Sequence, residues 1–191
     1  PPEGMIIGAF EPDPSYVGMT LAEIAEQRGK DAVTVYLELI AEADAIDGRE
    51  SIIARSMITD DIATLLSWPF TNVSSDGSLA GRHPRGFGAF TRVLAQHVRD
   101  RGDFSLETAI HKMTSLAAEN TGLAGRGTIT EGAFADLVLF DPATVSDRAT
   151  PEEPNLPSVG IVGVWVNGER VYTDAGTTGK RPGRVLRRRE G

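Results

Sequence analysis

The sequence contains no cysteine among its 191 residues. This absence excludes disulfides, thiolate nucleophiles and cysteine-ligated zinc from this stretch of polypeptide. Only three histidines are present, at positions 83, 97 and 111, and none belongs to a His-X-His pair. No apolar run approaches the roughly 20 residues of a membrane-spanning helix, and no N-terminal signal pattern is present. We therefore expect a cytoplasmic protein with no membrane partner.

Positive charge is also scarce, except at one end of the chain. The net charge is −8, yet residues 180–190 contain six of the 19 lysines and arginines. The remaining chain is markedly acidic, which argues against binding to nucleic acid. A short basic run at a terminus is usually solvated or folded back onto an acidic surface, and we favour that interpretation here.

The length and the composition indicate a globular protein. A chain of 191 residues allows one large domain, or one domain and a smaller one. The hydrophobic content of 40% and the charged content of 24% are ordinary for such proteins. The sequence starts at Pro1 without an initiator methionine. We expect this start to be a cut point inside a longer chain.

The first 122 residues alternate between strand and helix patterns. A capping box, Thr20 to Glu23, predicts the start of a helix that ends near Gly29. Strand, helix and strand with short links are typical of the βαβ unit of a parallel sheet. The predicted elements are strands at residues 5–10, Ser51–Met57 and Phe70–Ser75, and helices at residues 20–29, 31–45, 60–67, 89–101 and 105–120.

The sequence changes character after residue 122, where glycine, threonine and valine replace helix formers. A strand is predicted at residues 135–140. A hairpin is predicted at residues 162–173, because Asn167-Gly168 separates two β-rich runs and both turn positions need a positive φ. The pattern therefore predicts an α/β part, residues 1–122, and a small β part, residues 123–191.

A candidate active site follows the predicted strand at Phe70–Ser75. Asp76 stands where this strand gives way to a loop, and catalytic groups gather at such strand ends in parallel-strand folds. His83 and Arg85 come later on the same loop. A carboxylate facing a guanidinium suits an enzyme that activates water and holds an anionic substrate. The alternative is a solvated turn, because Asp-Gly is a common turn pair.

Six short motifs follow one another along the chain. They are Ser-Ser-Asp-Gly at 74–77, His-Pro-Arg-Gly at 83–86, Phe-Thr-Arg-Val-Leu at 90–94, Lys-Met-Thr-Ser at 112–115, Ala-Asp-Leu-Val-Leu-Phe-Asp at 135–141 and Val-Asn-Gly at 166–168. With these motifs, the sequence resembles the C-terminal portion of the N-acyl-D-amino-acid deacylases, or D-aminoacylases, of the amidohydrolase superfamily, from about residue 5 to residue 188.

The resemblance implies a fold, a reaction and a substrate. The fold is α/β: residues 1–122 form the C-terminal part of a metal-dependent-hydrolase TIM (β/α)8 barrel, with its last two strands and flanking helices. Residues 123–191 form the C-terminal share of a small β-sandwich, followed by the basic tail. The implied enzyme is a hydrolase that cleaves the linear amide bond of small-molecule N-acyl-D-amino acids, releasing a carboxylate and a D-amino acid.

The resemblance also assigns roles to residues. Asp76 matches the catalytic aspartate, which lies beside the metal and moves a proton from water to the departing amine. Arg85 matches the arginine that holds the substrate carboxylate, with His83 and Ser75 as further substrate-binding residues. Zinc is implied in the intact enzyme, with Asp76 at the metal and the remaining ligands absent from this chain. Because catalytic zinc needs three protein ligands, we expect this segment alone to bind no zinc and to be inactive.

Two alternatives stay open. An incomplete barrel would expose strand and helix faces, so the chain could be a non-catalytic, metal-free piece that self-associates or pairs with a missing N-terminal portion. A cyclic amidohydrolase of dihydroorotase or hydantoinase type is the other alternative. The His-Pro-Arg loop favours the deacylases, because an arginine suits the carboxylate of an acylated amino acid.

Overall fold

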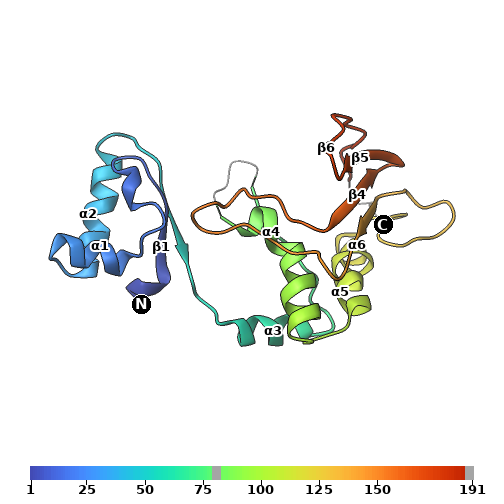
Figure 1. The fold of residues 1–191 in the computed structure, drawn as a ribbon, viewed down its shortest axis with the longest axis horizontal. Coiled ribbons are helices and arrows are strands. Elements are labelled where there is room, and N and C mark those ends of the chain that lie inside the picture. The colour runs from blue at the N-terminus through green and yellow to red at the C-terminus, as the bar shows by residue number, and fades with distance from the viewer. Residues whose placement is uncertain (79–82, 188–191) are drawn as a thin grey trace. The chain divides into compact units, whose positions relative to one another are not determined.

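The computed structural model describes residues 1–78 and 83–187, which belong to two compact units (Figure 1). The first unit comprises Pro1–Thr59, Asp76–Phe87 and Ala149–Leu156, and the second comprises Asp60–Ser75, Gly88–Arg148 and Pro157–Gly191. The predicted domain boundary after residue 122 falls inside the second unit, and that division stays a prediction. Within the described ranges, no helix has both the length and the apolar character needed to cross a bilayer.

The first unit is a two-stranded sheet with two helices. Strands β1 and β2 pair antiparallel, from Met5 opposite Ala54 to Phe10 opposite Glu50, with a bulge between Ile7 and Ala9. The unit contains the 3-10 helices η1 (Pro2–Gly4) and η2 (Pro14–Tyr16), the strands β1 (Met5–Phe10) and β2 (Glu50–Ala54), and the helices α1 (Leu21–Arg28) and α2 (Ala32–Asp44). Its core consists of Ile7, Phe10, Leu21, Ile24, Ala25, Val35, Leu39 and Ala43.

Local signals set the ends of α1 as the sequence predicts. The backbone N–H of Glu23 donates to Thr20 Oγ1 at 3.2 Å, and the N–H of Thr20 donates to Glu23 Oε2 at 2.7 Å, which completes the capping box. Gly29 ends the helix with a φ of 63°, in the left-handed region that glycine tolerates best. The predicted second helix is also confirmed, as α2, and Asp31 caps it by accepting from Thr34 N at 3.0 Å.

The expected parallel βαβ unit is wrong in its strand pairing. The predicted strand at Ser51–Met57 corresponds to β2, but β2 pairs antiparallel with β1. Residues Phe70–Ser75 form no strand. A strand needs neighbouring strands to satisfy its main-chain groups, and here the N–H of Val73 instead donates to the carbonyl of Lys112 at 3.2 Å.

The second unit combines helices with an antiparallel sheet in the order β3-β4-β5-β6. Helix α3 starts at Thr59 and helix α4 at Arg85, so the first residues of both belong to the first unit and the rest to the second. Its elements are α3 (Thr59–Ser67), α4 (Arg85–Arg92), the π-helix η3 (Val93–Asp100), α5 (Leu106–Met113), α6 (Ser115–Thr121), β3 (Leu137–Phe140), β4 (Ile161–Val166), β5 (Glu169–Thr173) and β6 (Gly176–Thr177). Its core consists of Val73, Val93, Leu94, Ala109 and Val145.

The two long predicted helices are each divided in the structure. The helix predicted at residues 89–101 begins earlier, at Arg85, and continues as η3 after Arg92. The helix predicted at residues 105–120 is interrupted at Thr114, which has a φ of −128° and a ψ of −88°. Before this interruption, Lys112 in the last turn of α5 hydrogen-bonds to an irregular segment of chain, residues 68–73.

The predicted hairpin is confirmed. Asn167 and Gly168 both have positive φ values, 49° and 83°, as a two-residue turn of this type requires. The N–H of Asn167 donates to Asp136 Oδ1 at 2.8 Å, and Arg126 pairs with the same carboxylate. These bonds tie the hairpin turn to the segment that precedes β3.

Candidate active site

The structure brings Asp76 and Arg85 together as an ion pair. Arg85 Nη2 lies 2.6 Å from Asp76 Oδ2, and Arg85 Nε donates to the main-chain carbonyl of Asp76 at 3.1 Å. The Asp76 side chain is 82% exposed and the Arg85 side chain is 47% exposed. The guanidinium is therefore held in a fixed orientation by one residue while much of its surface stays accessible.

Asp76 has an uncommon backbone conformation. Its φ is 46°, in the left-handed region that few non-glycine residues adopt, although aspartate is among those that tolerate it. Residues held in sparsely populated conformations gather at functional sites. The conformation directs both the carboxylate and the carbonyl of Asp76 towards the same guanidinium.

His83 supports the start of the helix that carries Arg85. The N–H of Arg85, the first residue of α4, donates to His83 Nδ1 at 3.2 Å. This bond places the proton of a neutral imidazole on Nε2. The carbonyl of His83 accepts from Gly86 N at 3.0 Å, so His83 makes two hydrogen bonds to the first turn of α4. Ser75, the fourth predicted site residue, is half-buried and directly precedes Asp76 in the chain.

A zinc site does not fit the residues in hand. Among residues 1–78 and 83–187, no group of three His, Cys, Asp or Glu side chains is placed to hold a metal ion. The other two histidines have other contacts: His97 Nδ1 lies 2.8 Å from Asp103 Oδ2, and His111 Nδ1 lies 2.7 Å from Ser115 Oγ. Asp76 alone cannot supply the three protein ligands of catalytic zinc.

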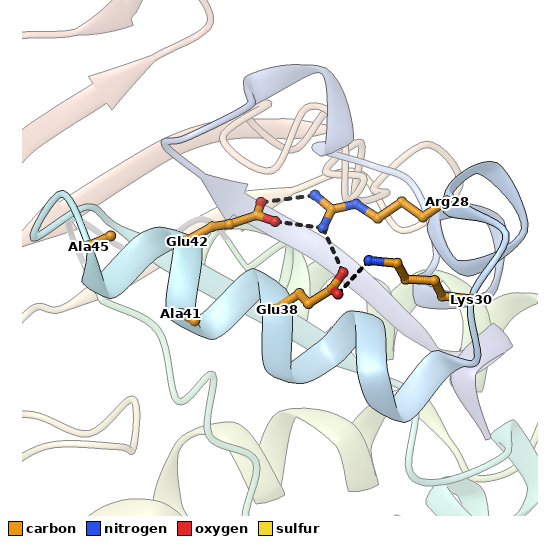
Figure 2. Close-up of a pocket in the computed structure, with 6 residues that line it drawn as sticks. All are labelled: Arg28, Lys30, Glu38, Ala41, Glu42 and Ala45. Atoms are coloured by element: carbon orange, nitrogen blue, oxygen red, sulfur yellow. Dashed lines mark hydrogen bonds and ion pairs between the residues drawn. The ribbon is translucent and has the colours of Figure 1, made fainter.

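A hollow on the first unit is a second candidate for a functional site (Figure 2). It measures about 580 Å³, and Arg28, Lys30, Glu38, Ala41, Glu42 and Ala45 line it. Arg28 binds both oxygens of Glu42, at 2.6 and 2.9 Å, while Lys30 Nζ lies 2.5 Å from Glu38 Oε1. Hydrogen bonds from Arg28 lower the pKa of Glu42. Each charge thus has an opposite partner within the hollow, which indicates a structural ion-pair network.

Sequence reasoning gave no role to Lys112. This lysine is 1% exposed, and its Nζ donates to main-chain carbonyls of the segment that precedes Asp76. A signal was present: Lys112 follows Ala109 by three residues and therefore lies on the same, buried face of α5. A lysine at such a position has to find hydrogen-bond partners inside the protein.

The sequence is similar to proteins of a known family. The family model described as "Amidohydrolase family" matches residues 16–172. The D-aminoacylase of Alcaligenes xylosoxydans xylosoxydans is 44% identical over 185 residues, which cover 96% of this chain and 37% of that protein. The N-acyl-D-glutamate deacylase of the same organism is 44% identical over 179 residues, covering 93% of this chain and 35% of that protein.

A solved structure gives the same result. The N-acyl-D-glutamate deacylase of Bordetella bronchiseptica, complexed with zinc and a phosphonate inhibitor, superposes with a TM-score of 0.82 at 40% identity. The match covers 97% of this chain and 38% of that chain. The predicted resemblance and fold class are confirmed, and the deacylases are favoured over the dihydroorotase or hydantoinase alternative. This chain spans little more than a third of the length of these relatives.

Proposed function

The chain belongs to the amidohydrolase family, and on that premise we propose that it supplies the Asp76–Arg85 part of the active site of an N-acyl-D-amino-acid deacylase. The enzyme hydrolyses the amide bond of its substrate to a carboxylate and a D-amino acid. The observation that carries the proposal is the exposed ion pair, 2.6 Å long, between a residue with left-handed backbone and the first residue of a helix.

Arg85 binds the substrate carboxylate in this proposal. The guanidinium already has a carboxylate partner in Asp76, so its orientation suits this anion. The two bonds to Asp76 use two of the five N–H groups of an arginine side chain. The half-exposed guanidinium can therefore receive a second carboxylate beside the first, and the planar fork gives that contact a direction which a lysine lacks.

Asp76 moves the proton. Its carboxylate accepts a proton from the attacking water and delivers it to the amide nitrogen as the C–N bond breaks. General acid–base catalysis of this kind contributes typically about 10²- to 10⁴-fold to the rate. The ion pair with Arg85 keeps the carboxylate close to the position where the substrate is anchored.

Zinc belongs to the proposal only for the intact enzyme. The solved relative from Bordetella bronchiseptica holds zinc, whereas the described residues of this chain do not make a three-ligand site. We place those ligands on parts of the enzyme outside this sequence.

Pairing with another part of the enzyme is the second element of the proposal. The second unit exposes large apolar side chains, among them Leu65, Trp68 and Phe70 near the end of α3, and Val138 and Leu139 on β3. Large apolar side chains that are exposed in one part of an enzyme are expected to pack against another part of it. Co-expression of this chain with the upstream part of its polypeptide should yield a stable complex, whereas this chain alone should self-associate or aggregate.

The decisive experiment uses the complete polypeptide that carries this sequence. We expect it to hydrolyse N-acetyl-D-amino acids and to leave the L-enantiomers intact, as measured by release of the free amine. Asp76→Asn should lower kcat by about 10²- to 10⁴-fold, because asparagine keeps the left-handed backbone but cannot accept the proton.

Asp47→Asn is the matched control. Asp47 is the other aspartate with a positive φ, 51°, in the described structure, and it lies in the turn between α2 and β2. This variant should keep wild-type kcat. Full activity in Asp76→Asn would refute the role of Asp76, and a complete polypeptide without amide hydrolysis would leave the non-catalytic alternative.

A further inference from the structure

Lys112 is an unusual residue of the second unit. It lies in the last turn of α5 and is 1% exposed. Its Nζ donates to the main-chain carbonyl of Trp68 at 2.5 Å and to that of Thr71 at 3.1 Å. Lysine is almost never fully buried unless it is paired. The described partners of this ammonium are neutral carbonyls, and burial lowers the pKa of Lys112.

The bonded segment explains why a lysine is needed. Residues 68–73 connect α3 to the residues before Asp76 and form neither helix nor strand. At the start of this segment, the described structure has two main-chain turn bonds. The N–H of Trp68 donates to the carbonyl of Leu65 at 3.3 Å, and the N–H of Thr71 donates to the carbonyl of Trp68 at 3.1 Å. Buried main-chain groups without a sheet ladder must find other partners. A long side chain with three donors can reach two carbonyls at once.

Lys112 also contributes its own backbone to the same segment. The N–H of Val73 donates to the carbonyl of Lys112 at 3.2 Å. Lys112 therefore makes three hydrogen bonds to residues 68–73, two through Nζ and one through its carbonyl. Val73 is buried in the core of the second unit, and Asp76 follows it by three residues.

We propose that Lys112 is a positioning residue of the deacylase reaction, which fixes the backbone of residues 68–73 and thereby the approach to Asp76. This inference rests on the proposed function. Asp76 keeps a left-handed φ, and such a conformation persists only where the surrounding structure determines it. A displacement of about 1 Å in a catalytic group can cost on the order of 10²-fold in rate.

The test compares two substitutions in the complete polypeptide. Lys112→Met keeps the length and the apolar stem but removes the donors, whereas Lys112→Arg keeps donors at the end of a longer chain. We expect Lys112→Met to lower kcat at least 10-fold and to change KM less than twofold, because Arg85 still binds the substrate. Lys112→Arg should recover part of kcat. Lys180→Met is the matched control, since Lys180 is 60% exposed and pairs with Glu169, and it should match the wild type.

Hydrogen exchange makes the test independent of the reaction. In Lys112→Met, the amides of residues 68–76 should exchange faster, while those of α1 and α2 should not change. Unchanged exchange at residues 68–76 would show that Lys112 does not fix the backbone of this segment. Faster exchange with unchanged kcat would show that the segment does not position Asp76. Either result would overturn the proposal. An equal loss of kcat in Lys112→Met and Lys112→Arg, with faster exchange throughout the protein, would show that Lys112 only stabilises the fold, and would also overturn the proposal.

The failure of the proposed function gives a different result. A wild-type polypeptide without activity would refute that function, and hydrogen exchange would still decide whether Lys112 fixes the backbone of residues 68–73.

Discussion

Two arginines of the first unit face carboxylates in different ways. Arg28, the last residue of α1, binds both oxygens of Glu42 on α2, donates to the Tyr16 hydroxyl at 3.3 Å and lies over the Tyr16 ring at 5.3 Å. Its side chain is 18% exposed. Arg85 contacts one carboxylate oxygen of Asp76 and is 47% exposed.

The difference separates a structural arginine from one that can exchange partners. A guanidinium that is bound on its edge and covered on its face has little capacity for another ligand. Arg85 has one side-chain partner among its described contacts and stays open to solvent. The same residue type with the same kind of partner thus fits two roles, and the number and burial of its contacts distinguish them.

The largest effect expected to distinguish Arg85 from Arg28 is on substrate binding. Arg85→Lys in the complete polypeptide should raise KM about 10-fold with a smaller change in kcat, because an ammonium cannot make two parallel bonds to a carboxylate. Steady-state kinetics with an N-acetyl-D-amino acid measure the effect. Arg28→Lys is the control and should leave KM as in the wild type. A KM that does not change in Arg85→Lys would remove Arg85 from the proposed substrate site.

The next effect concerns stability. Arg28→Met should destabilise the pairing of α1 with α2 by about 1–2 kcal/mol, since it removes charge-assisted hydrogen bonds from a largely covered group. The amide exchange of α1 and α2 measures this local free energy of unfolding. Arg85→Met should leave exchange in α1 and α2 unchanged, because Arg85 makes no described bond to either helix. Equal effects of both substitutions would erase the distinction between the two arginines.

The same contrast shows what sequence could predict. The ends of α1, the start of α2 and the hairpin at Asn167-Gly168 follow from residues within a few positions of one another, and all are confirmed. The motif residues Asp76, His83 and Arg85 do lie close together, through the ion pair and through the bond from Arg85 N to His83. Their catalytic roles stay proposals.

The failures involve partners that are distant in sequence. Whether Phe70–Ser75 forms a strand depends on neighbouring strands, and in the described structure its Val73 N–H binds the carbonyl of Lys112, 39 positions later. The antiparallel partner of β2 is β1, and their paired residues are 40 to 49 positions apart. Local patterns carry no information on either choice, so the sequence predicted neither the antiparallel pairing of β2 nor the irregular conformation of Phe70–Ser75.

The smallest expected effect is the response of the Arg28 network to acid. The pKa of Glu42 is lowered first by hydrogen bonds from Arg28 and further by the charges of Arg28 and Lys30. A depressed carboxyl pKa adds stability that is present above the pKa of the unfolded chain, about 4.3 for glutamate, and is lost as the pH falls through the folded value. Exchange in α1 and α2 should therefore accelerate as the pH drops below about 4.3, once the intrinsic pH dependence of exchange is removed. Glu42→Gln should weaken protection at neutral pH and flatten this response. If the amides of α1 and α2 are equally protected above and below this pH, the ion pair with Glu42 contributes nothing to stability. Arg28 would then hold the two helices through its contact with Tyr16 and through packing.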